Sequence, residues 1–438
     1  MSKNLTPLDR CFCAMNVQTL VGRNELMSEE KELTLQDVEQ AIANNSAAAF
    51  RCVTKLQPAG GSGDKVFPPT YEGGKYAIEN RMSPGGEEVV PCVLLDSVQS
   101  QANRMELALL DGIRMQRFSL PLLEVRFDHE KLMKKIVVTS LDAPHRVADA
   151  IFRDSLIDGI VFRKSKKGKI LDCADIRNAT GLFGICPTAL LFGIWDSTGP
   201  RGGLGTKFQR AIVSEIIGYN AIPGVKTSSR IDPLQVTIGA GTLYVRREKS
   251  EKVPDWTFEE EKAIQENNEG KKYGKDGKPS ELNHGNVTPT ITDGGFTISY
   301  ALQTTVISLS ALRRLCFPLN GCVESERNIN NTARTTLAVL GLTAATLAQE
   351  NGLDLRSRCQ LFPMEKSSWE LLDDPTKLPT RYTLNSKTAE KLLNEAIEKA
   401  KNSKLPWEGK ILLTPSDDLL TLVAKSQELA ASEGSGEE

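Results

Sequence analysis

The clearest pattern along the chain is a strand-like apolar run that passes directly into an amphipathic helix over residues 94–106. At a helical repeat, the polar side chains share one arc of about 100° and the apolar ones share the opposite arc. Asp96 precedes the helix and can cap it, with Gln99 completing a capping-box-like pair. One face is therefore expected to pack and the other to contact a ligand, with free N–H groups at the helix start that suit phosphate. The polar arc consists of Ser97, Ser100, Gln101 and Arg104.

A second pattern joins an apolar run at 188–195, read as a strand, to a glycine-rich basic loop and a further apolar stretch. From Phe208 to Tyr219 the apolar residues recur at three and four residues, which predicts a helix. The intervening loop combines glycines, which let the backbone approach an anion closely, with positive charge. Its order of residues is not that of a nucleoside-triphosphate P-loop, and a tight turn with solvated charges stays an alternative. The loop candidates are Arg201, Gly202, Gly203, Gly205, Lys207 and Arg210.

A third basic segment lies between two apolar runs over residues 160–171, the pattern of a hairpin. Five of the seven residues at 163–169 are basic, which makes this predicted hairpin tip a further candidate contact for a polyanion. A solvated loop tip is the alternative, since charge runs are usually exposed faces. The candidate side chains here are Lys164, Lys166 and Lys167.

The rest of the chain divides at changes in composition. Residues 57–74 are rich in Gly and Pro and predict a loop. Residues 246–281 hold 19 charged residues, 9 basic and 10 acidic, and we interpret 246–293 as a mobile charged insertion. A buried helix is expected at 332–350, and amphipathic helices at 387–401 and 417–429 precede an acidic tail expected to be disordered. Two regions follow: a core over 1–370 and a helical C-terminal extension over 371–438.

Composition limits the functional classes. The 438 residues carry 54 basic and 56 acidic side chains, a net charge of −2, so any nucleic-acid site must be a local patch. The nine cysteines are scattered without a CxxC pair, which argues against zinc and favours a reducing cytoplasm. The chain shows neither a secretory h-region nor an apolar run long enough to span a membrane.

The sequence contains few residues arranged as a catalytic site would require. Only three histidines are present, and none sits in a nucleophile arrangement with Ser or Cys. His145 and Arg146 follow Pro144, which can begin a helix, and both can face a ligand, although a structural histidine is the more common case. Asp96, Asp149 and Asp154 could hold Mg²⁺, but their spacing does not gather them on one turn. We therefore predict no metal and no cofactor.

Four segments together resemble the backbone subunit of type I-G, formerly I-U, CRISPR effector complexes, a family of repeat-associated RNA-binding proteins. The segments are 94–106, 144–146, 201–210 and 302–315. The resemblance covers most of residues 1–365, and its most specific part is 96–106. It implies an α+β fold: a modified RRM or ferredoxin-like palm with inserted finger-like and thumb-like elements. Either the 163–169 tip or the charged insertion would be the thumb.

The resemblance also implies a function. The chain would be a non-catalytic subunit in the prokaryotic cytoplasm that polymerises along a CRISPR RNA and presents the spacer for pairing with target DNA. Its other partners would be further copies of itself, the large subunit, and the fused subunit that caps and processes the CRISPR RNA. Sequence-tolerant binding needs contacts to phosphate and 2′-hydroxyl groups. The residues expected to supply them are Ser97, Ser100, Gln101, Asn103, Arg104, His145, Arg146, Lys164, Lys166, Lys167, Arg201, Gly202, Gly203, Gly205, Lys207 and Arg210.

Two other functions stay open. One is a metal-dependent ribonuclease of a related RNA-targeting CRISPR effector, in which Asp149 or Asp154 would hold Mg²⁺. The other is a regulator that binds a phosphate or a nucleotide through residues 199–207.

Overall fold

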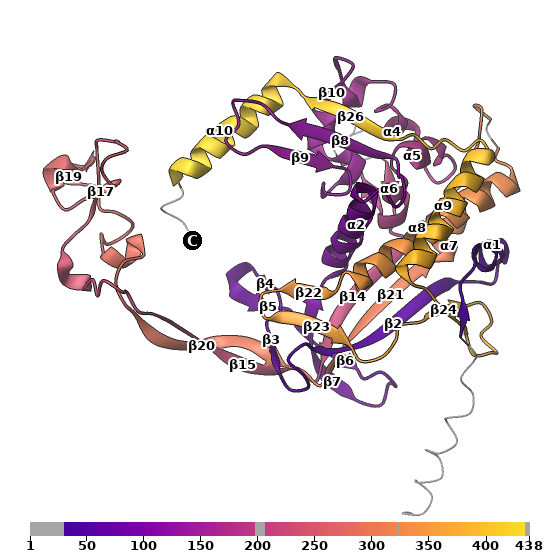
Figure 1. The fold of residues 1–438 in the computed structure, drawn as a ribbon, viewed down its shortest axis with the longest axis horizontal. Helices are drawn as coiled ribbons and strands as arrows, with labels where there is room; N and C mark the ends of the chain where they lie inside the picture. Colours follow the sequence, from indigo (N-terminus) through magenta and orange to yellow (C-terminus); the bar gives the residue numbers. More distant parts are fainter. Residues whose placement is uncertain (1–29, 198–205, 323, 434–438) are drawn as a thin grey trace, which may run out of the picture.

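The computed structural model describes residues 30–197, 206–322 and 324–433 and is a mixed α+β protein with several sheets (Figure 1). The main sheet has ten strands. Eight follow the order β1-β25-β24-β2-β21-β14-β7-β6, and β22 and β23 extend it beside β2. All neighbours are antiparallel except β1 and β25. Their bounds are Lys31–Glu32 (β1), Ala49–Pro58 (β2), Ile78–Met82 (β6), Val89–Asp96 (β7), Ile212–Tyr219 (β14), Tyr300–Ser308 (β21), Leu353–Arg356 (β22), Cys359–Pro363 (β23), Trp369–Leu372 (β24) and Thr380–Thr383 (β25).

Long helices cover one face of this sheet (Figure 1). The helix α8 packs against α2 and α1 and is covered in turn by α9. Small residues let α8 and α9 approach closely: the Thr336 and Thr343 hydroxyls donate to carbonyl oxygens of both helices. The expected helices at 332–350 and 387–401 are confirmed. The bounds are Leu35–Ala43 (α1), Val98–Arg114 (α2), Leu309–Arg313 (α7), Arg327–Glu350 (α8) and Ser386–Asn402 (α9).

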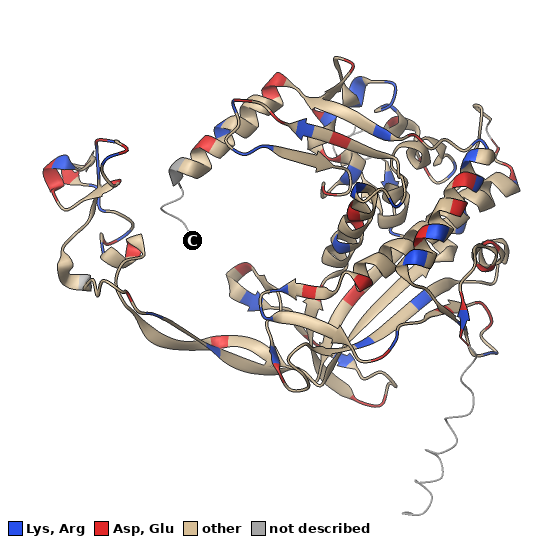
Figure 2. Ribbon diagram, viewed as in Figure 1, with Lys and Arg blue, Asp and Glu red and all other residues tan. Residues whose placement is uncertain are grey.

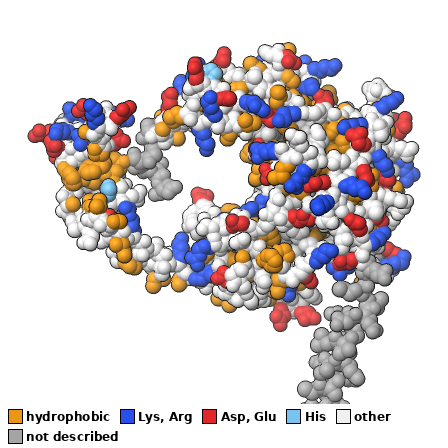
Figure 3. Space-filling view, in the orientation of Figure 1, with side chains coloured by type: hydrophobic (Ala, Val, Ile, Leu, Met, Phe, Trp, Pro, Cys, Tyr) orange, Lys and Arg blue, Asp and Glu red, His pale blue; other side chains and the backbone are white. Residues whose placement is uncertain are grey.

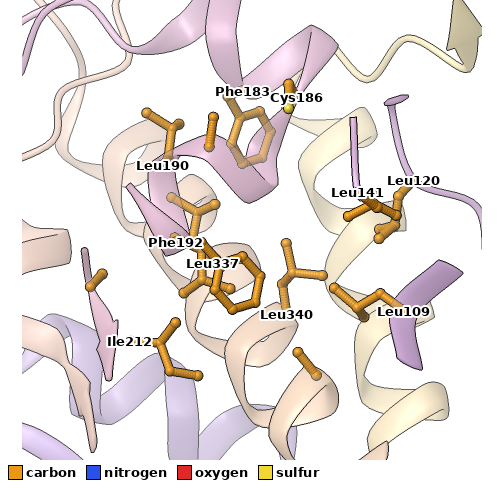
Figure 4. Packing of buried hydrophobic residues seen from close by; sticks show 14 of the residues in the cluster. Leu109, Leu120, Leu141, Phe183, Cys186, Leu190, Phe192, Ile212, Leu337 and Leu340 are labelled. Atoms are coloured by element: carbon orange, nitrogen blue, oxygen red, sulfur yellow. The ribbon is translucent and has the colours of Figure 1, made fainter. Parts of the chain in front are cut away.

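A second, five-stranded sheet has the order β11-β10-β26-β8-β9, and β26 runs parallel to β8. Four short helices accompany it, and α6 packs against α8. Figure 4 shows Leu109 of α2, Phe192 of α6 and Leu340 of α8 pointing into one shared core. The bounds are Leu122–Phe127 (β8), Ile136–Thr139 (β9), Ser155–Ile157 (β10), Ile160–Val161 (β11), Lys410–Pro415 (β26), Ala150–Arg153 (α3), Ile170–Cys173 (α4), Thr180–Ile185 (α5) and Pro187–Phe192 (α6).

A long two-stranded ribbon, β15 and β20, leaves the body and ends in a small module formed by residues 231–286 (Figure 1). We call the ribbon and this tip module the arm. The charged stretch at 246–281 lies in the tip module and includes three short strands, β17, β18 and β19. Its mobility stays a prediction. The bounds are Ile222–Arg230 (β15), Val287–Thr297 (β20), Lys65–Val66 (β3, which pairs with β20), Tyr244–Val245 (β16), Trp256–Thr257 (β17), Gln265–Glu266 (β18) and Glu269–Gly270 (β19).

The structure corrects two predictions around the glycine-rich loop. The run at 188–195 forms α6, which starts with Pro187 at its first turn, and then the short strand β12. The stretch at 208–219 is not a helix but β13 followed by β14. The segment forms a strand because β14 pairs with β21 on one side and with β7 on the other. The Ile and Val residues of β14 also favour a strand over a helix. The bounds are Ile194–Trp195 (β12) and Lys207–Phe208 (β13).

The basic run at 163–169 is not a hairpin tip. The hairpin lies before it, between β10 and β11, and the run continues as the 3-10 turn Phe162–Lys164 and then α4. Arg163 draws the run onto the body, because its Nη2 lies 2.8 Å from Asp172 Oδ1 and 2.9 Å from Asp196 Oδ2. The predicted loop at 57–74 also contains β3, β4 (Thr70–Tyr71) and the 3-10 turn Glu72–Gly74, before β5 (Lys75–Tyr76).

Residues 371–438 are more than a helical extension. They contain α9 and α10 (Asp417–Glu433), as predicted, but also β25 in the main sheet and β26 in the middle of the second sheet. The acidic tail at 434–438 lies outside the described residues. Within the described residues, none of the helices combines the length and the apolar character that crossing a membrane requires.

We expect Leu393→Ala in α9 to lower the free energy of unfolding by about 2–5 kcal/mol, because this fully buried side chain belongs to the main core. Urea unfolding measures the change. The matched control is Lys391→Ala on the same helix, whose side chain is 75% exposed and whose replacement should cost less than about 0.5 kcal/mol. A cost below about 1 kcal/mol for Leu393→Ala would mean that α9 is not part of the core.

Candidate nucleic-acid interface

Three segments that are distant in sequence meet at one pocket of about 470 Å³. They are the first turns of α2, the turn at 144–146, and the α6 end with the β12–β13 hairpin. Among the described residues that line the pocket, none is acidic, whereas several are cationic or carry amides. This combination suits an anionic ligand with hydrogen-bonding groups. The lining residues are Gln99, Ala102, Asn103, Pro144, His145, Arg146, Phe192, Gly193, Ile194, Trp195, Lys207, Phe208, Gln209 and Arg210.

The start of α2 is fixed by Ser97, not by Asp96 as predicted. The Ser97 side chain accepts a hydrogen bond from the Ser100 backbone N–H at 3.3 Å. Asp96 is instead the fully buried last residue of β7. Its carboxylate accepts hydrogen bonds from Gln101 Nε2 at 2.6 Å, Arg104 Nε at 2.9 Å and Arg356 Nη2 at 3.3 Å. This network joins α2 to β7 and β22.

Gln101 continues the same network into the main sheet. Its Oε1 accepts from Ser214 Oγ at 2.9 Å on β14 and from Gln303 Nε2 at 2.8 Å on β21. Gln101 is only 2% exposed, and Arg104 donates to the Leu355 carbonyl oxygen at 2.7 Å. Part of the polar arc of α2, which was expected to contact a ligand, therefore faces the main sheet. The positions of Gln101 and Arg104 give no support to RNA contacts by these two residues.

Arg146 forms the floor of the pocket through a buried ion pair with Glu106 of α2. Its Nε and Nη2 donate to the two Glu106 carboxylate oxygens at 2.6 and 2.8 Å, and its Nη1 donates to the Gly193 carbonyl oxygen at 3.1 Å. The guanidinium also lies 5.4 Å from the centroid of the Phe192 ring. Burial raises the pKa of Glu106 to about 7, and Arg146 opposes that rise. Arg146 thus ties α2, the 144–146 turn and the α6–β12 corner together.

Gly193 allows the corner between α6 and β12 to close against β13. It has a φ of +85°, and a Cβ there would lie 3.1 Å from both the Phe208 carbonyl oxygen and the Arg210 nitrogen. Lys207 is exposed and pairs in register with Trp195, and its Nζ lies 5.5 Å from the centroid of the indole ring. Arg210 is half-buried at the pocket wall.

The structure brings together only part of the predicted set. Asn103 and His145 are exposed at the pocket, and Ser97 and Ser100 are half-buried beside it at the start of α2. Lys164 and Lys166 are exposed elsewhere, and Lys167 pairs with Glu408. None of these three lysines lines the pocket. Arg201, Gly202, Gly203 and Gly205 lie outside the described residues, in the segment 198–205 between β12 and β13.

Among the pocket residues that the sequence did not single out as candidate site residues, three have side chains suited to ligand contacts: Gln99, Trp195 and Gln209. Trp195 had a signal in the sequence, because a large aromatic residue directly precedes the glycine-rich basic loop. The sequence pattern presents Gln99 only as part of a helix cap. It predicts a helix at Gln209 that does not form, so it gives no indication that this side chain lies on the pocket wall.

We expect Arg146→Ala to lower the free energy of unfolding by about 3–5 kcal/mol at neutral pH, because it leaves the Glu106 carboxylate buried without its cation. The double variant Glu106→Leu/Arg146→Met is the control and should recover most of the loss. Denaturant unfolding measures both. A cost below about 1 kcal/mol for the single variant would show that the pair does not hold the turn in place.

The same variant should show a distinct pH dependence. Without Arg146, the pKa of Glu106 rises further above its ordinary value of 4.5, so the folded state holds a proton that the unfolded state has lost. Stability then increases as the pH falls from neutral toward 4.5, and it increases more in Arg146→Ala than in the native protein. Unfolding curves over this pH range test the expectation. A deficit that stays constant or grows on acidification would contradict it.

One comparison with known proteins matches the segment of the chain that contains the pocket. Residues 50–223 match the family described as CRISPR-associated protein GSU0053. A search of curated proteins finds no match to this chain. The matched segment contains α2, the 144–146 turn and the β12–β13 hairpin, and therefore every residue that lines the pocket. Through this segment, which is less than half of the chain, the protein is similar to the family of CRISPR-associated protein GSU0053.

Proposed function

We propose that the chain is a non-catalytic backbone subunit of a type I-G, formerly I-U, CRISPR effector complex. It binds the CRISPR RNA, oligomerises along it as a helical filament, and presents the spacer for pairing with target DNA. The pocket carries the proposal. It joins cations and amides from three segments, without an acidic residue among its described lining, inside the part of the chain that matches a CRISPR-associated family.

The topology of the main sheet supports the proposal of an RRM-like palm. The four strands β24-β2-β21-β14 are mutually antiparallel neighbours, and α2 and α8 pack on one side of them. Taken in chain order, these elements read β2, α2, β14, β21, α8, β24. Strand, helix, strand, strand, helix, strand with this spatial order is the ferredoxin-like arrangement. Insertions between β2 and α2 and between β14 and β21 would be the added finger-like and thumb-like elements.

The charge distribution fits a local RNA site. Figure 2 shows Lys, Arg, Asp and Glu mixed over the body and the tip module, consistent with the net charge of −2. A guide carrier must bind RNA of any spacer sequence, which favours contacts to phosphates and sugars over contacts to base edges. Lys207, Arg210 and Asn103 at the pocket can make such contacts.

The arm is our candidate for the thumb-like element, in preference to the basic run at 163–169, which Arg163 and Lys167 hold against the body. Its ribbon exposes large apolar side chains, among them Ile222, Val225 and Ile291. Exposed apolar side chains on one element are suited to contact with another macromolecule, and we propose that this partner is the next copy in the filament. Figure 3 shows the molecule hollowed between the arm and the body, with α2 on the opposite wall in Figure 1.

The ribonuclease alternative gains no support from its candidate aspartates. Asp149 caps α3: its carboxylate accepts hydrogen bonds from the Ile151 and His145 backbone N–H groups. Asp154 pairs with the Arg153 guanidinium at 2.7 Å. In the parts of the chain that the structure describes, no group of three or more His, Cys, Asp and Glu side chains is placed to hold a metal ion. The nucleotide-regulator alternative depends on residues 198–205, outside the described part.

Purification without nuclease treatment tests the proposal directly. We expect the full-length protein to copurify with discrete RNA in a large particle that dissociates as the salt concentration rises. Size-exclusion chromatography with light scattering, together with sequencing of the extracted RNA, measures this. A monomer free of nucleic acid at low salt would contradict the proposal.

Lys207→Ala and Arg210→Ala should each weaken binding to single-stranded RNA and reduce the slope of log K against log[salt] by about one, because each removes one cation near phosphate. Lys391→Ala on α9, outside the pocket, is the matched control and should leave both quantities unchanged. Fluorescence anisotropy over a salt series measures them. An unchanged slope in both pocket variants would exclude these two residues from the interface.

A further inference from the structure

Trp195 stands out as an exposed aromatic ring beside a polar pocket. Of the four tryptophans, Trp369 is buried, Trp256 and Trp407 are partly buried, and Trp195 is 56% exposed. It is the last residue of β12, and cross-strand pairing with Lys207 fixes its position in the hairpin. Tryptophan presents a large, rigid, flat surface, so its exposure at a pocket wall is suited to a flat ligand.

The rest of the pocket complements a nucleobase. A base has two apolar faces and an edge of hydrogen-bond donors and acceptors. The side-chain amides of Gln99, Asn103 and Gln209 can donate and accept, and Phe192 adds an apolar wall. Lys207 places a cation next to the indole ring, where the phosphate that follows a stacked base would lie. The volume of about 470 Å³ leaves room for one base and part of its sugar.

We propose that Trp195 stacks on one nucleobase of the bound single-stranded nucleic acid, and that this base enters the pocket with its edge toward the amides. The inference rests on the proposed function and specifies how the same site holds its ligand. Base stacking is sequence-tolerant, because every base has an aromatic face. The site therefore selects an unpaired nucleotide without selecting its identity, and a continuous duplex cannot fill it because its bases are stacked on one another.

Binding of labelled oligo(U) to the full-length protein, measured over a salt series, tests the proposal. Trp195→Leu should weaken binding roughly five- to a hundredfold while the salt slope stays unchanged, because stacking involves no counterion release. Trp195→Phe keeps an aromatic face and should retain most of the affinity. Lys207→Ala should lower the salt slope, so the two neighbouring residues have separate signatures. An RNA duplex of the same length should bind the native protein and Trp195→Leu equally.

The outcomes separate the two claims. If Trp195→Leu binds oligo(U) with native affinity, the stacking proposal is overturned while the RNA-binding function stands. If the native protein itself fails to bind single-stranded RNA at low salt, the proposed function fails. Because Trp195→Leu alters a hairpin, a second measurement needs no variant. RNA that carries 2-aminopurine should lose fluorescence when it binds the native protein, and normal binding without any quenching would overturn the proposal.

Discussion

The buried ion pair between Arg146 and Glu106 joins the three chain segments on which the pocket depends. Glu106 comes from α2, Arg146 from the 144–146 turn, and the same guanidinium donates to the Gly193 carbonyl oxygen at the corner between α6 and β12. Both charged groups are buried away from water, so removing either one would leave the other as an unpaired buried charge, which destabilises the folded state. The pair therefore fixes the geometry of the pocket floor more than it contributes net stability. Residues on the rim of the pocket, such as Lys207 and Asn103, belong to elements that this ion pair holds together.

The positively charged side chains discussed above have two different roles, and the sequence alone does not tell which residue has which role. Arg104, Arg146, Arg163 and Arg356 use their guanidinium groups within the molecule, on carboxylates and carbonyl oxygens. Lys207 and Arg210 lie where a ligand can reach them. Arginine suits the first task because its planar fork satisfies several acceptors at once. A near-neutral chain can thus keep a local anionic-ligand site while much of its positive charge is used to hold elements together.

The long helices could be predicted because their apolar periodicity extends over many turns, as in α8 and α9. The stretch at 208–219 could not, since Ile212, Ser214 and Ile216 also fit the alternation of buried positions in a strand, and β14 has a neighbouring strand on each side. Asp96 looked like a helix cap, and only the contacts from Arg104 and Arg356 reveal a buried carboxylate. The strand β26 pairs with β8 nearly three hundred residues away, a non-local contact that local pattern does not encode. Of the predicted site residues, Asn103, His145, Lys207 and Arg210 lie at one pocket, and their contact with RNA stays a prediction. The burial of Gln101 could not be predicted, because it depends on the sheet beneath this residue.

The account depends on the pocket being the place where RNA meets this chain. Ultraviolet cross-linking of single-stranded RNA to the full-length protein, followed by mass spectrometry of the cross-linked peptides, tests this most directly. We expect cross-links at Trp195 and at neighbouring residues of α2, the 144–146 turn and the β12–β13 hairpin, with the strongest at the aromatic ring. Cross-links confined to the exposed lysines at 164–166, with none in the pocket segments, would contradict the account.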